Sequence, residues 1–108
     1  MTNRERLPDR RHCENFQIEV PNLKHQIVVT VGFYPDGRLA EVFVSDVKAG
    51  STTDAVMRDA AVLLSIALQY QVPLNVIANA ITRNLDGSPS SAVGVLIDVL
   101  AKETSHGR

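Results

Sequence analysis

Apolar and polar residues alternate with a period of two in the first half of the chain, and with a period near 3.6 after Gly50. Period two is typical of a strand with one buried face, and period 3.6 of an amphipathic helix. The pattern predicts strands near 16–20, 26–34 and 38–46, and helices near 52–70, 73–83 and 90–103. The predicted fold class is therefore α+β, a three-stranded antiparallel β-meander followed by three helices packed on one face.

The strand faces follow from the alternation. One face of the second strand carries Ile27, Val29, Val31 and Phe33, and one face of the third carries Ala40, Val42 and Val44. Leu39, Glu41 and Phe43 lie on the opposite face of the third strand. We nevertheless expect Phe43 in the core. We expect Glu41 to pair with Arg38 or Arg58 rather than to act as a catalyst.

The first helix is apolar over an unusually wide surface. In its first half Val56, Ala60 and Leu63 are predicted to face inward, and in its second half Ser65 is the one polar residue between Val62 and Leu68. A helix apolar on most sides must be covered on most sides. One small domain offers few layers for this. The sequence therefore predicts a homodimer with helical surfaces at the interface, formed by this helix or by Val95 and Val99 of the last one.

The two ends of the chain differ from the middle. Arg4, Arg6, Arg10 and Arg11 lie in a segment with almost no large apolar residue. Such a segment buries too little surface to offset its ordering entropy. We expect residues 1–15 to form a mobile Arg-rich arm that could contact a partner, residues 16–104 a single domain, and residues 105–108 a frayed tail.

Composition narrows the function classes. The chain has 108 residues, 44% of them hydrophobic and 21% charged, with a formal net charge of −1. A near-neutral chain of this size predicts one globular domain without a general attraction to nucleic acid. It has one cysteine and no apolar run long enough for a membrane span. These features predict a cytoplasmic protein that does not bind membranes.

Four short segments occur in an order and spacing that resemble the TSCPD domain, an accessory module at the C-terminal end of many adenosylcobalamin-dependent ribonucleotide reductases. They are Glu41–Val44, Lys48–Ser51, Leu64–Leu68 and Val72–Leu74. The resemblance implies a module without the reductase's catalytic barrel, cobalamin site or substrate site.

Two departures from this family affect the prediction. The cysteines for which the family is named have no counterpart in the segment 90–94, so no thiol or metal role carries over. Relatives usually have glycine immediately before the Val-Pro-Leu segment, where this chain has Gln71. Gln71 would be strained in a left-handed helix end, or the helix would end with a different cap.

Candidate chemistry is sparse. A metal site needs three or four converging ligands, and the available histidines and cysteine (His12, Cys13, His25 and His106) are scattered. We predict no metal and no cofactor. An anion or phosphate would bind best at the start of the first helix, where backbone N–H groups lie beside Lys48, Gly50, Ser51 and Thr52.

These observations favour a small non-catalytic binding or regulatory module that acts through a protein partner, which could be a reductase or another enzyme of nucleotide metabolism. Two alternatives remain open. One is nucleic-acid or nucleotide-phosphate binding through the basic arm and the segment 48–52, which the charge balance disfavours. The other is a small enzyme of unrecognised type.

Overall fold

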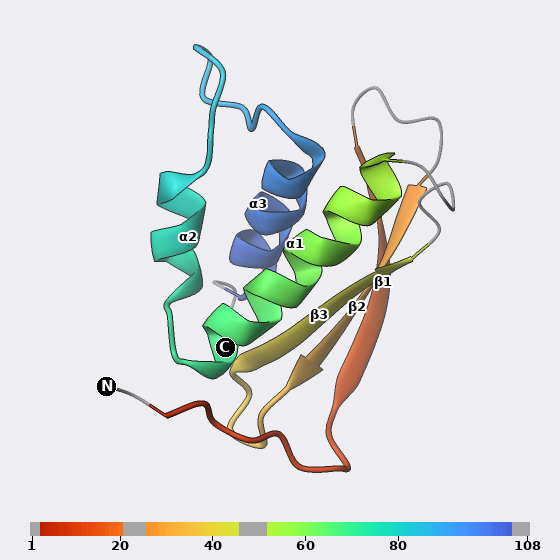
Figure 1. Cartoon of the computed structure of the whole chain (residues 1–108), viewed down its shortest axis with the longest axis vertical. Helices are drawn as coiled ribbons and strands as arrows, with labels where there is room; N and C mark the ends of the chain where they lie inside the picture. Colours follow the sequence, from red (N-terminus) through yellow and green to blue (C-terminus); the bar gives the residue numbers. More distant parts are fainter. Residues whose placement is uncertain (1–2, 21–25, 46–51, 105–108) are drawn as a thin grey trace.

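The computed structural model describes residues 3–20, 26–45 and 52–104. Three strands precede three helices, as the periodicity predicted, and the three helices lie on one side of the sheet (Figure 1). The strands are β1 (Cys13–Glu19), β2 (Gln26–Phe33) and β3 (Leu39–Ser45), and the helices are α1 (Thr52–Gln69), α2 (Leu74–Ala80) and α3 (Ala92–Thr104). The α+β fold class is confirmed. β1 begins three residues earlier than predicted, and α2 ends three residues earlier.

The sheet has the order β1-β2-β3 with both pairs antiparallel. Val29 lies opposite Phe16 on one side and Val44 on the other, so apolar residues of all three strands share the face beneath the helices. Val29, Val42 and Ala40 are almost completely buried. The register with β3 shifts between Gly32 and Phe33, next to the β2–β3 turn.

Phe43 does not lie in the core, so that prediction was wrong. It faces Thr30 across β2–β3 and is 56% exposed. Successive side chains of a strand point to opposite faces. Because Val42 and Val44 point toward the helices, Phe43 must point away from them.

The buried face of α1 is also displaced from the predicted one. Val56 and Leu63 are 51% and 69% exposed, whereas the core residues of α1 are Met57, Ala61, Leu64 and Leu68. This face packs on β3, while α2 packs on α3 (Figure 1). The core residues of α3 are Leu96, Ile97 and Leu100, which are buried, and Val93, which is partly buried.

The end of α1 bears out the expectation for Gln71. Its φ of 62° lies in the left-handed region. The N–H of Val72 donates to the carbonyl of Ala67 at 3.0 Å, and that of Gln71 donates to Leu68 at 3.0 Å. These two bonds form a Schellman motif, whose left-handed position favours glycine. The chain thus turns into α2 through a conformation that costs a side chain with a Cβ some strain.

Candidate functional site

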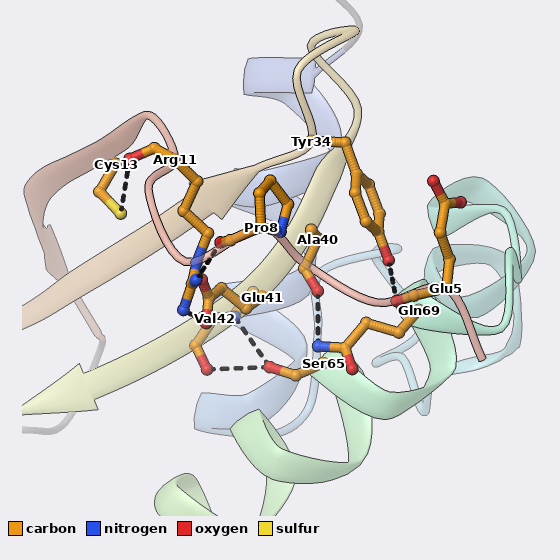
Figure 2. A network of polar contacts seen from close by, with 10 residues as sticks. All are labelled: Glu5, Pro8, Arg11, Cys13, Tyr34, Ala40, Glu41, Val42, Ser65 and Gln69. Atoms are coloured by element: carbon orange, nitrogen blue, oxygen red, sulfur yellow. Dashed lines mark hydrogen bonds and ion pairs between the residues drawn. The ribbon is translucent and has the colours of Figure 1, made fainter.

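A polar network joins the N-terminal segment, the described residues 3–12 before β1, to β3 and α1 (Figure 2). Glu41 on β3 is 5% exposed, and its side chain lies over Gly32 of β2. A Cβ added at Gly32 would lie 2.7 Å from Cγ of Glu41. The glycine therefore leaves the space that the carboxylate occupies.

The partner of Glu41 is Arg11. The Arg11 guanidinium donates from Nε to Oε2 and from Nη2 to Oε1, the second at 3.3 Å, and also from Nη1 to the carbonyl of Pro8 at 2.6 Å (Figure 2). The hydrogen bond to Glu41 raises the pKa of Arg11. Both carboxylate oxygens of Glu41 therefore already accept hydrogen bonds from Arg11.

The expectation that Glu41 pairs with Arg38 or Arg58 was wrong. Arg58 donates to Asp54 one helical turn earlier, at 2.8 Å. Arg38 makes two bonds to Glu5, at 2.8 and 2.9 Å, and one to Asp36 at 2.7 Å. Arg11 is 30 positions from Glu41 in the sequence, so local spacing gave no sign of this pair.

A second contact holds the N-terminal segment at the β2–β3 turn. The Tyr34 hydroxyl donates to the Glu5 carbonyl at 2.8 Å, and the Arg38 guanidinium lies 4.6 Å from the Tyr34 ring centroid. The hydrogen bonds from Arg38 lower the pKa of the Glu5 carboxyl. Burial raises the pKa of Tyr34. The hydroxyl thus stays protonated and donates.

Two polar side chains of α1 reach the outer edge of β3. The Ser65 hydroxyl accepts from the N–H of Val42 at 2.8 Å and lies 3.1 Å from the Val42 carbonyl oxygen. The Gln69 amide donates to the carbonyl of Ala40 at 3.1 Å (Figure 2). Backbone groups of an edge strand would otherwise stay open to another strand. These side chains supply the bonds that a fourth strand would make.

Gln69 also binds the N-terminal segment. Its side-chain oxygen accepts from Nε of Arg4 at 2.7 Å, and its backbone carbonyl accepts from the N–H of Glu5 at 2.8 Å. Figure 1 shows the segment before β1 passing the β2–β3 turn on its way to the end of α1. All four predicted arginines are exposed, and Arg4 and Arg11 also make the internal contacts described above. That residues 1–15 are mobile stays a prediction.

A groove of about 390 Å³ runs between β3 and α1 beside this network. Phe43, Val62 and Ile66 form its apolar walls, with Arg4 and Arg58 among its lining residues. Sequence reasoning missed the groove because it assigned Phe43 to the core. Strict alternation along β3 would have placed Phe43 on the open face.

The remaining predicted sites are only partly described. Thr52 is the first residue of α1, whereas Lys48, Gly50 and Ser51 lie outside the described residues. The anion site is therefore still a prediction. Thr52 is exposed.

Of the four residues considered as metal ligands, two are described by the structure and two are not. His12 lies 2.8 Å from a Glu14 oxygen and Cys13 is exposed, while His25 and His106 lie outside the described residues. Within 3–20, 26–45 and 52–104, no three potential ligands converge on a metal position.

The network is chemically saturated. Throughout the part of the chain that the structure describes, every buried side-chain nitrogen or oxygen has a hydrogen-bond partner. An arrangement of this kind holds elements together, whereas a general acid or base must be able to reach a substrate. The same part of the chain has no helix both long and apolar enough for a bilayer.

Comparison with known proteins gives one consistent relationship. A family model described as "TSCPD domain" matches residues 3–103. A vitamin B12-dependent ribonucleotide reductase of Rhodopirellula baltica is 45% identical over 76 residues, which are 70% of this chain and 7% of that protein. Reductases of the same description from Bradyrhizobium diazoefficiens and Agrobacterium fabrum are each 35% identical, over 82 and 79 residues, or 76% and 73% of this chain and 6% of each relative. No solved structure matches.

Proposed function

This chain belongs to the TSCPD domain family, and we propose that it is a non-catalytic binding module that acts by contacting a protein partner in nucleotide metabolism. The chain spans only 6–7% of the length of the curated relatives. The proposal includes a regulatory role and a cytoplasmic location.

The groove between β3 and α1 carries the proposal. Phe43 is 56% exposed and Val62 also 56%, although both are apolar. Exposed apolar surface rimmed by polar residues marks interaction sites on soluble proteins. The rim arginines Arg4 and Arg58 favour a partner with acidic residues beside an apolar anchor, because such residues would add electrostatic complementarity.

The partner to test first is a vitamin B12-dependent ribonucleotide reductase from which the region similar to this chain has been deleted. Binding of the purified chain to that reductase can be followed by isothermal titration calorimetry. We expect a specific complex that Phe43→Ser weakens at least about 10-fold, since one buried aromatic anchor commonly contributes more than 1.4 kcal/mol. Val76→Ser is the matched control, because Val76 on α2 is 54% exposed and lies outside the groove.

Two outcomes count against the proposal. The first is the absence of heat and of a co-migrating complex with the truncated reductase. The second is equal affinity of the Phe43→Ser and parent proteins, which would place the contact elsewhere. The folded state of each variant is checked by circular dichroism, and exposed Phe43 should be replaceable without unfolding the domain.

The phosphate-binding alternative receives less support. One of its four arginines, Arg11, already donates to the buried Glu41, and the formal net charge of the chain is −1. A nucleic-acid binder must lose affinity steeply as salt rises. Titration with a single-stranded oligonucleotide at two salt concentrations would separate this alternative from protein binding, which depends on the apolar groove.

A further inference from the structure

The outward surface of α1 carries an apolar stripe that the core does not use. Val56, Ala60, Leu63, Ala67 and Tyr70 follow one another at intervals of four, three, four and three residues. Tyr70 continues the helical pattern, since its N–H donates to the Ile66 carbonyl at 3.1 Å. Intervals of this kind place all five side chains along one line of an α-helix, about 21 Å long.

The stripe is open to solvent. The exposed fractions are 51% for Val56, 69% for Leu63 and 42% for Tyr70, and the two alanines between them are partly exposed. Four of the seven exposed large hydrophobic residues of the described chain, Val56, Val62, Leu63 and Tyr70, belong to α1 or to its end. Such a concentration on one helix is unusual for the free surface of a soluble protein.

The order of side-chain sizes along the stripe favours a second copy of α1 as the surface that covers it. Large residues at 56 and 63 alternate with alanines at 60 and 67. If two copies of α1 lie antiparallel about a two-fold axis between residues 61 and 62, Leu63 faces Ala60 of the partner subunit and Val56 faces Ala67 of the partner subunit. Tyr70 then faces Thr53 of the partner subunit, so every large side chain of the stripe meets a smaller one, which is the condition for close interdigitation.

A parallel pair does not have this property. It would place Leu63 against Leu63 of the partner subunit and Ala60 against Ala60 of the partner subunit, leaving alternating crowded and empty layers. The stripe itself contains no charged residue, so the antiparallel pair brings no unpaired charge into the contact. Two-fold pairs that use the same patch on both subunits are the commonest oligomers of soluble proteins.

We propose that the chain forms a two-fold dimer in which the Val56–Tyr70 stripes of two α1 helices pack antiparallel, with each leucine seated on an alanine of the other copy. The dimer goes beyond the proposed partner binding and does not depend on it, because Phe43 lies on the strand side of the groove, outside the stripe.

Sedimentation equilibrium over micromolar concentrations measures the mass directly. We expect a dimer whose dissociation constant rises at least about 100-fold in Leu63→Asp, because two leucines leave an apolar contact and two charges enter it. Leu85→Asp is the matched control and should keep the dimer, since Leu85 is exposed and distant from α1 in the sequence. Both variants should keep the parent circular dichroism spectrum, because both positions are exposed.

The antiparallel orientation of the two α1 helices is tested separately by disulfide cross-linking in a Cys13→Ser background. Val56→Cys and Ala67→Cys proteins, mixed and oxidised, should give a disulfide-linked pair, whereas Val56→Cys alone should give none. A monomeric parent at all concentrations, a Leu63→Asp protein that remains dimeric, or efficient linkage of Val56→Cys to itself would each overturn the proposal. Loss of reductase binding in a protein that stays dimeric would affect only the proposed function.

Discussion

Replacing Ser65 by alanine tests whether α1 closes the edge of the sheet. Ser65 is 9% exposed, and its hydroxyl accepts from the Val42 N–H at 2.8 Å. Alanine leaves that N–H buried without an acceptor, which costs about 1–3 kcal/mol. The higher helix propensity of alanine offsets roughly 0.5 kcal/mol. The free energy of unfolding should therefore fall by about 0.5–2.5 kcal/mol, a decrease of about 2–10 °C in Tm at roughly 4 °C per kcal/mol.

Urea denaturation measures this difference, and hydrogen exchange locates it. The Val42 amide should exchange faster in Ser65→Ala, relative to its neighbours on β3, because its bond to the helix is gone. Asp59→Ala is the control on the same helix, since Asp59 is exposed and its replacement should change the free energy by less than about 0.5 kcal/mol. A Ser65→Ala protein as stable as its parent, with an equally protected Val42 amide, would refute the edge-closing role.

Gly32, Gln71 and the ion pair between Arg83 and Asp98 can each be tested by substitution. Gly32→Ala should cost about 1–3 kcal/mol of unfolding free energy in urea, because its Cβ would meet the Glu41 side chain, and a simultaneous Glu41→Ala should recover most of this. Gln71→Gly should raise the stability by about 0.5–1 kcal/mol in thermal melts, because glycine adopts a φ of 62° without strain, whereas Gln71→Ala should not. The hydrogen bond from Arg83 lowers the pKa of Asp98 in the folded state. The stabilisation from this pair is therefore complete above the unfolded aspartate pKa of about 4 and is lost as the pH falls through the folded value. The difference in unfolding free energy between the parent and Arg83→Met should shrink across that range, and a constant difference would contradict the prediction.

The order of the elements could be predicted because it depends on local periodicity, which changes once, at Gly50. The rotation of α1 about its own axis could not be predicted from the periodicity. Val56 and Leu63 repeat with the same period as Met57 and Leu64, so two adjacent helix faces are equally apolar. Only the position of β3 decides which of the two faces is buried, and that contact is a property of the tertiary structure.

The candidate site was harder to predict than the fold for a related reason. Glu41 was recognised as a paired charge, but Arg11 lies 30 positions away in a segment without periodicity. Ser65, by contrast, carried a usable signal. A single polar residue inside an apolar helical run indicates either exposure or a specific buried acceptor, and in this chain it binds the β3 backbone. The expectation for Gln71 succeeded because a left-handed helix end constrains one residue locally.

The Ser65 hydroxyl and the Gln69 amide of α1 also determine at which edge the sheet can be extended by a further strand. A strand arriving from another chain would find the β3 edge already hydrogen-bonded at Val42 and Ala40, so among the described strands β1 offers the more open edge. Two molecules joined through β1 would make a six-stranded sheet with a closed edge at each end. Strand addition would then stop at a pair, so this arrangement protects the protein against open-ended polymerisation into fibres.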